Sequence, residues 1–318
     1  MSWRTWTDFA KQSKLALRLA DRLGRGRGRM RWIDAMNPPP PAPLKPDLSN
    51  WASLDLAAVW IGHATVLLRI GGMTILTDPV FSHRIGIGMA LFTVGPQRKM
   101  RAAITIAELP PLDLILISHA HFDHLDRPTL DRLPKRTPVV TAGATRDLIA
   151  DLGYQNVTEL RWGETNALGS LTIRAQEVTH WGARTFYDSY RGYNGYFLEA
   201  AGRRVLYGGD TAYQEKFRGT GRVDLAVLGI GAYNPYIRAH ATPEQAWEMA
   251  QHAGADAVLP IHHSTFQLSH EPMNEPMERM MAAAGREGER VVVREVGGMW
   301  VGGVTSAEGG DAQDAEAF

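Results

Sequence analysis

The sequence predicts a layered α/β fold in which sheets of short strands are covered by helices. Short apolar runs separated by Gly, Asp and Pro begin near residue 51 and alternate with a few windows of helical periodicity. The chain has 318 residues, and 44% of them are hydrophobic, so it can bury a substantial core. This composition excludes a disordered or collagen-like chain.

The expected strands begin with an antiparallel unit. Strands are expected at residues 57–61 and 66–70, a tight turn at Gly71 and Gly72, and a strand at residues 73–77 that pairs back. Further strands are expected at 112–117, 139–141, 171–178, 193–199, 203–206, 225–228 and 257–261. Helices are expected at 144–152, 242–253 and 275–284.

The helix at 242–253 carries the clearest boundary signals. Thr242 is a suitable N-cap, Pro243 fits the first turn, Gln245 completes a capping box, and Gly254 can end the helix.

Composition shifts divide the chain into four parts. Residues 1–36 form a basic amphipathic extension, and residues 37–50 a stiff proline-rich connector. Residues 51–304 form the main domain, and residues 305–318, with four acidic residues and no basic one, are expected to be a flexible tail.

The charge and cysteine counts exclude several classes of protein. With 34 basic and 34 acidic residues, the whole chain has no charge excess that would attract nucleic acid. Without cysteine there is no disulfide framework and no thiolate ligand, so a bound metal must be held by His and carboxylate. No stretch has the ~20 apolar residues of a membrane span or the apolar core of a secretory signal. We therefore expect a cytoplasmic protein, with peripheral contact at the inner membrane face as an option.

The strongest chemical signal is the segment Ser118 to His124, which reads SHAHFDH and follows a strongly apolar strand. Three histidines and an aspartate in six positions arise by chance only about once in a thousand such chains. If the chain stays extended, His119 and His121 project from the same side and can hold one ion. Asp123 and His124 lie where the chain turns and can face a second ion. Imidazole and carboxylate are donors that Zn²⁺ accepts.

This segment resembles the HxHxDH signature of the metallo-β-lactamase-fold hydrolases, met here at His119, His121, Asp123 and His124. The resemblance is to the branch that includes N-acylphosphatidylethanolamine-hydrolysing phospholipase D, and it covers about residues 55–270. The other matching segments are 61–65 (IGHAT), 77–82 (TDPVFS), 95–96 (GP), 117–119 (ISH), 180–181 (HW), 208–211 (GGDT) and 260–266 (PIHHSTF).

The resemblance implies an αββα sandwich with two mixed β-sheets flanked by helices, and two zinc ions, with Mn²⁺ or Fe²⁺ as an alternative at one site. It assigns His119, His121 and His180 to one ion and Asp123, His124 and His262 to the other, bridged by Asp210. His180, Asp210 and His262 each follow a predicted strand, and α/β folds place their active sites at such strand ends.

For several other residues near the expected metal centre, two roles are open. His63 and Asp78 match family motifs near the metal centre, where they would fix ligand imidazoles, although Asp78 before a proline also suits an Asx turn. His240 matches a position near the substrate phosphate or closes a loop. His262 is preferred as the ligand to His263, which takes a variable position.

The resemblance favours a phosphodiesterase of phospholipase D-like type, acting on a small-molecule or phospholipid-like substrate. In that mechanism a metal-bridging hydroxide attacks phosphorus, and Asp123 also manages a proton. The alternatives are a same-fold hydrolase of a lactone, thioester or sugar-phosphate lactone, and a non-catalytic, membrane-associated metal-binding protein.

Deleting residues 1–36 should reduce binding to anionic vesicles without changing turnover of a small soluble substrate. Residues 1–31 contain nine basic and two acidic residues, a net charge of +7, with Trp3 and Trp6 interleaved. Each basic residue near an anionic leaflet contributes about 1 kcal/mol, and salt screens the attraction. Vesicle co-sedimentation at low and high salt measures it. Lost activity or unfolding of the truncated protein would instead mean that the segment packs as part of the domain.

Overall fold

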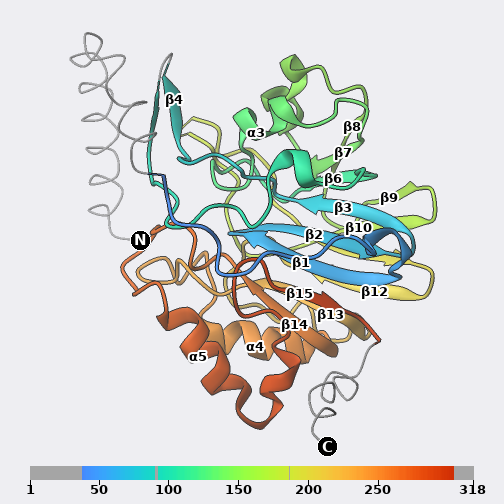
Figure 1. The fold of residues 1–318 in the computed structure, drawn as a ribbon, viewed down its shortest axis with the longest axis vertical. Coiled ribbons are helices and arrows are strands. Elements are labelled where there is room, and N and C mark those ends of the chain that lie inside the picture. The colour runs from blue at the N-terminus through green and yellow to red at the C-terminus, as the bar shows by residue number, and fades with distance from the viewer. Residues whose placement is uncertain (1–37, 90–91, 186, 304–318) are drawn as a thin grey trace, which may run out of the picture.

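The computed structural model describes residues 38–89, 92–185 and 187–303. Two mixed β-sheets pack face to face, with helices on the outer faces (Figure 1). The predicted αββα sandwich is confirmed. The expected extension at 1–36 and tail at 305–318 lie outside the described residues.

The first sheet has seven strands in the order β15-β1-β2-β3-β6-β7-β8. Its bounds are β1 (Leu56–Gly62), β2 (Thr65–Ile70), β3 (Met73–Thr77), β6 (Leu114–Ile117), β7 (Val139–Ala142), β8 (Val157–Leu160) and β15 (Met299–Val301). The expected turn at Gly71 and Gly72 joins β2 to β3, with positive φ at both glycines as a tight hairpin requires. Strands β3, β6, β7 and β8 are parallel, so their carboxyl ends share one edge.

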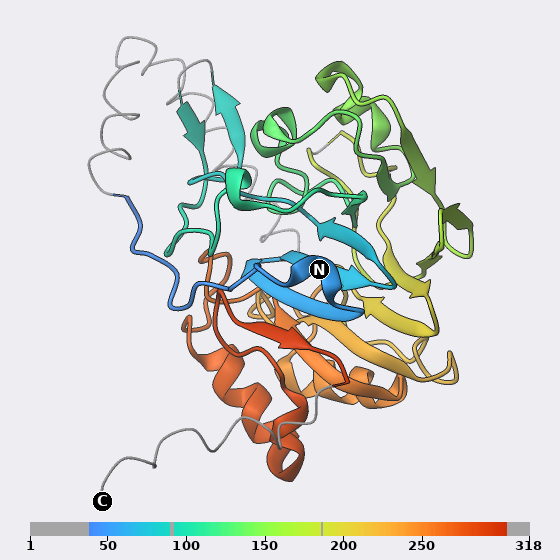
Figure 2. The same cartoon turned by 45° about the vertical axis from the view of Figure 1, so that its right-hand side comes forward.

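The second sheet has six strands in the order β14-β13-β12-β11-β10-β9. Its bounds are β9 (Thr165–Leu168), β10 (Leu171–Gln176), β11 (Gly195–Ala200), β12 (Arg203–Tyr207), β13 (Val223–Gly229) and β14 (Ala255–Ile261). Strands β12, β13 and β14 are parallel, and their carboxyl ends also share an edge. A short hairpin of β4 (Ile87–Met89) and β5 (Phe92–Val94) extends away from both sheets (Figure 2).

Apolar side chains fill three layers. The central core lies between the sheets, with members such as Leu68 and Leu116 from the first and Tyr207 and Leu259 from the second. Helices α4 (Pro243–His252) and α5 (Glu275–Ala284) cover the outer face of the second sheet. Helix α3 (Arg127–Arg132) contributes to the cluster on the outer face of the first sheet.

The boundary signals of α4 act as predicted. The Thr242 hydroxyl accepts from the Gln245 N–H at 3.3 Å, and the Gln245 side chain accepts from the Thr242 N–H at 3.0 Å. This capping box fixes the start of the helix at Pro243, shortly after His240.

The predicted helix at 144–152 is wrong. The segment forms two short 3₁₀ turns, Arg146–Leu148 and Ala150–Leu152. Ala144 has a left-handed backbone, and Glu159 accepts from the N–H groups of Thr145 and Arg146, which holds the segment against β8. The strands β8, β9 and β15, the hairpin β4–β5 and helix α3 were not among the expected elements.

Residues 38–50, within the expected connector, lie against the main domain. The Leu44 N–H donates to the Val296 carbonyl at 3.1 Å, and the Arg101 N–H donates to the Pro40 carbonyl at 2.8 Å. Within the described residues, no helix is both long and apolar enough to cross a membrane.

Candidate metal centre

The structure gathers the predicted site residues at the edge where the carboxyl ends of both sheets' parallel strands meet. The first sheet supplies the loop after β6 with the HxHxDH motif, and Asp78 after β3. The second sheet supplies the segments after β10, β12 and β14. The residues brought together are His63, Asp78, His119, His121, Asp123, His124, His180, Asp210, His240 and His262.

Asp210 lies at the centre of this cluster. One carboxylate oxygen, Oδ2, has five imidazole nitrogens within 4 Å, belonging to His124 (3.1 Å), His262 (3.1 Å), His180 (3.7 Å), His240 (3.8 Å) and His119 (3.9 Å). Asp210 is buried, and its Oδ1 has no hydrogen-bond partner among the described residues.

The first group of nitrogens consists of His119 Nε2, His121 Nδ1 and His180 Nε2. His121 Nδ1 lies 2.8 Å from His119 Nε2 and 3.2 Å from His180 Nε2. Ligand atoms at 2.0–2.1 Å from a tetrahedral zinc ion are about 3.3 Å apart, so this group needs little movement to hold one ion.

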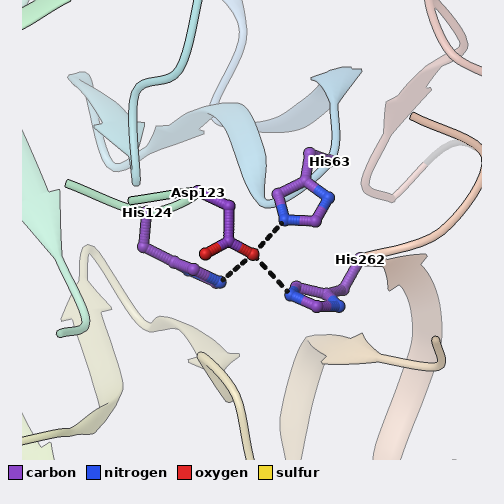
Figure 3. Close-up of side chains that lie close together, drawn as sticks. All are labelled: His63, Asp123, His124 and His262. Carbon is purple, nitrogen blue, oxygen red and sulfur yellow. Dashed lines mark hydrogen bonds and ion pairs between the residues drawn. The ribbon is translucent and has the colours of Figure 1, made fainter. Parts of the chain in front are cut away.

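The second group surrounds Asp123 (Figure 3). Its Oδ2 lies 2.9 Å from His63 Nε2, 3.3 Å from His262 Nε2 and 3.6 Å from His124 Nε2. The Nε2 atoms of His124 and His262 are buried and have no aligned hydrogen-bond partner among the described residues. Unpartnered buried nitrogens beside two carboxylates fit a divalent cation, since leaving such groups unsatisfied is costly.

Asp78 fixes the orientation of histidines in both groups. Its Oδ2 accepts hydrogen bonds from His124 Nδ1, the Ser118 hydroxyl and the Tyr207 hydroxyl, each at 2.6 Å, and its Oδ1 accepts from the Ser118 N–H. The Ser118 oxygen in turn lies 2.8 Å from His119 Nδ1. These bonds leave the Nε2 atoms of His119 and His124 directed toward Asp210.

His180 and the HxHxDH loop are held by groups that sequence reasoning missed. The Ala239 carbonyl accepts from His180 Nδ1 at 2.9 Å, which directs Nε2 toward the centre. Arg184 donates to the carbonyls of Ala120 and Leu125, at 2.7 and 2.8 Å, and so ties together both ends of the loop. Only the closeness of Arg184 to His180 in the sequence could have drawn attention to it.

Electrostatics keep the first group unprotonated. Burial, together with the rings of His124, His121 and His180, holds the pKa of His119 well below its usual value. Burial and the facing His180 lower the pKa of His121 to about 3, and burial also lowers the pKa of His180. All three present free lone pairs at neutral pH.

Two histidines of the second group, His124 and His262, have raised pKa values instead. Burial opposes charge on His124, but the carboxylates of Asp210, Asp123 and Asp78 raise its pKa well above the usual value. The pKa of His262 rises to about 9 against the effect of burial, because of Asp210 and Asp123. In the metal-free protein, protons on these imidazoles balance the charge that a divalent cation would balance when bound.

The two adjacent histidines have different surroundings. His262 faces Asp123 and Asp210, whereas the ring of His263 packs on Trp60 with centroids 4.5 Å apart. His263 Nδ1 bonds to the Ser264 hydroxyl.

The comparisons with known proteins point to one family. The family described as "Beta-lactamase superfamily domain" matches residues 73–263. An uncharacterised protein of Mycobacterium tuberculosis is 32% identical over 274 residues, which cover 81% of this chain and 72% of the relative. The N-acyl-phosphatidylethanolamine-hydrolyzing phospholipase D 1 of Caenorhabditis elegans is 31% identical, over 77% of this chain and 75% of the relative. The structure of a possible metal-dependent hydrolase from Veillonella parvula superposes with a TM-score of 0.62 at 18% identity, covering 78% of this chain and 99% of that one.

Replacing His262 should remove one ion, and replacing His263 should remove none. His262→Ala deletes a nitrogen 3.1 Å from Asp210, whereas His263→Ala deletes a ring packed on Trp60 and should cost about 1–3 kcal/mol of stability. Metal content by mass spectrometry and denaturant unfolding measure the two effects. Loss of an ion in His263→Ala alone would reverse the assignment.

Metal binding should release protons at pH 7. His124 and His262 have raised pKa values in the metal-free protein, that of His262 to about 9, and both must lose a proton to become ligands. As the pH is lowered below about 9, the affinity for the metal ion should therefore fall about tenfold per pH unit for each proton displaced. Calorimetry in buffers of different ionisation enthalpy counts the protons. A binding enthalpy independent of the buffer would contradict these pKa shifts.

Proposed function

The chain belongs to the beta-lactamase superfamily domain family and is a metal-dependent hydrolase, and from this premise we propose that it cleaves phosphodiesters with the help of two divalent ions. Zinc is the proposed metal at both positions, with Mn²⁺ or Fe²⁺ as the alternative at one. The observation that carries this proposal is the position of Asp210 Oδ2 between two sets of imidazoles.

Each proposed ion would have its own set of residues. His119, His121 and His180 would hold one, and Asp123, His124 and His262 would hold the other, with Asp210 shared between them. Two such ions, when bound, make water a nucleophile at neutral pH and neutralise charge that develops on a phosphoryl group.

His63 adds a further contact to the second set. Burial and the nearby His262 lower the pKa of His63 to about 3, so the ring is neutral and donates one N–H. If that proton is on Nε2, it binds Asp123 Oδ2 at 2.9 Å and fixes the carboxylate. This bond would hold Asp123 in place as the residue that accepts or returns a proton beside the scissile bond.

His240 lies on the solvent side of the centre. Its Nδ1 is 3.8 Å from Asp210 Oδ2, and 14% of its side chain is exposed. Burial and the surrounding histidines His180 and His262 keep its pKa well below the usual value despite the nearby Asp210. A neutral imidazole here can donate a hydrogen bond to a phosphoryl oxygen without holding a charge that competes with the metal ions.

Two observations support a substrate that is a phosphodiester with an apolar substituent. The C. elegans relative is named for hydrolysis of a phospholipid. The rim of the centre also presents exposed apolar surface, since Trp181, Tyr236 and Ile237 are 37%, 39% and 43% exposed, and the Trp181 ring lies 5.7 Å from that of His121. Such side chains favour a small phospholipid-like substrate over a nucleic acid, which would require a basic stripe.

We place this activity in the cytoplasm, with residues 1–36 as a peripheral contact to the inner membrane face. The support is the sequence alone: a net charge of +7 with interleaved aromatics in residues 1–31, and no cysteine in the chain.

The metal-loaded protein should hydrolyse a bis-aryl phosphodiester faster than a lactone or a thioester. His240→Ala should lower kcat/KM for the phosphodiester by about 100-fold or more while both ions stay bound. The exposed His83 offers a matched control, and His83→Ala should change neither activity nor metal content. A lactone or thioester turned over more than tenfold faster than the phosphodiester would assign the enzyme to carbon centres.

A further inference from the structure

The segment from Ile230 to Ala241 passes over the metal centre and touches both sets of imidazoles. It begins at the end of β13, where the Ile230 N–H donates to the Ile261 carbonyl at 3.0 Å. It ends where the Ala241 N–H donates to the Thr211 carbonyl at 2.8 Å, next to Asp210. We refer to residues 230–241 as the crossing segment.

The crossing segment supplies two contacts to the first group of imidazoles. The Ala239 carbonyl accepts from His180 Nδ1, and His240 places its ring 5.1 Å from that of His180. A tight turn sets both residues, because the N–H groups of Ala239 and His240 both donate to the Tyr236 carbonyl, at 2.8 and 3.0 Å. The orientation of His180 therefore depends on where this segment lies.

One buried carboxylate anchors the start of the crossing segment. Glu271 is 4% exposed, and its Oε1 accepts from the Ala232 N–H at 2.6 Å and from the Ser269 hydroxyl at 2.5 Å. Its Oε2 accepts from the Asn234 N–H at 3.2 Å. The Asn234 carbonyl accepts from the His270 N–H at 2.9 Å, which ties the two segments together a second time.

The Glu271 carboxylate supports an unusual backbone conformation in the crossing segment. Ala232 adopts a left-handed backbone with φ 63°, which a non-glycine residue keeps only where its surroundings fix it. Gly231 passes so close to the His262 backbone that a Cβ there would lie 2.2 Å from the His262 carbonyl oxygen. Removing the carboxylate would leave the buried Ala232 N–H unpaired, which is unfavourable.

We infer that Glu271 is a positioning residue that acts through the crossing segment on His180 and His240. This inference rests on the metal-binding part of the proposed function. Gly231 packs against the His262 backbone, but the hydrogen bond from the crossing segment to a ligand imidazole is made at His180, through the Ala239 carbonyl. Its loss should therefore weaken the ion held by His119, His121 and His180.

Hydrogen exchange of the metal-free protein tests the anchoring directly. In Glu271→Ala, the hydrogen-bonded amides of Ala232, Asn234, Ala239 and His240 should exchange at least tenfold faster, while those of helix α4 keep their rates. Exchange in the crossing segment at the wild-type rate would overturn the inference, whatever reaction the enzyme catalyses.

Metal titration against a chromophoric chelator tests the consequence. Glu271→Ala should weaken one of two Zn²⁺ affinities by about 10- to 100-fold, as loss of a residue that orients a ligand usually does. The affected ion should be the one that His180→Ala removes. Glu271→Gln, which keeps an acceptor for Ala232, should show a smaller loss at the same ion.

Glu275 provides the matched control, because it binds a side chain of the crossing segment, whereas Glu271 binds backbone N–H groups. Its carboxylate accepts from the Tyr233 hydroxyl at 2.7 Å, and Glu275→Gln should leave both affinities unchanged. Unchanged affinities in Glu271→Ala, or loss of the ion that His262→Ala removes, would overturn the inference. If Glu271→Ala does not fold, wild-type affinities in Glu271→Gln overturn it. A wild-type protein that binds no metal would instead overturn the proposed function.

Discussion

The structure depends on a buried carboxylate that must be neutralised. Asp210 lies among five imidazoles, and burial works against its charge, yet His124 and His262 hold its pKa well below the usual value. Two sheets must meet for this to occur, since the HxHxDH loop comes from one and Asp210 from the other. The hydrogen bond from the Tyr207 hydroxyl to Asp78 Oδ2 joins the sheets directly behind the centre. Metal binding and sheet packing are therefore linked through the same few buried polar groups.

The local parts of the fold could be predicted from the sequence, because they depend on neighbouring residues. The antiparallel strands around Gly71 and Gly72 and the helix that begins after Thr242 follow from turn and capping chemistry. The window at 144–152 has the composition of a helix, but contacts from Glu159, more than ten positions away, hold its start in another conformation. Sheet order is a further long-range property, so the pairing of β15 with β1 was not predicted.

The candidate site likewise has residues that the sequence indicates and contacts that only the structure shows. The motif at 119–124 is visible from spacing alone, and the family resemblance extends the set to residues that the structure brings together. The bond from Ala232 to Glu271 spans 39 positions, and no periodicity indicates it. The different surroundings of His262 and His263 depend on a left-handed backbone, with φ 64° at His262, which sequence composition does not indicate.

X-ray diffraction from metal-loaded crystals at the absorption edge of zinc decides whether Asp210 is shared between two metal ions. We expect two anomalous peaks about 3.5–4 Å apart. Asp210 would contact both, with His119, His121 and His180 at one and Asp123, His124 and His262 at the other. A single peak, or two peaks of which neither lies within bonding distance of Asp210, would contradict it.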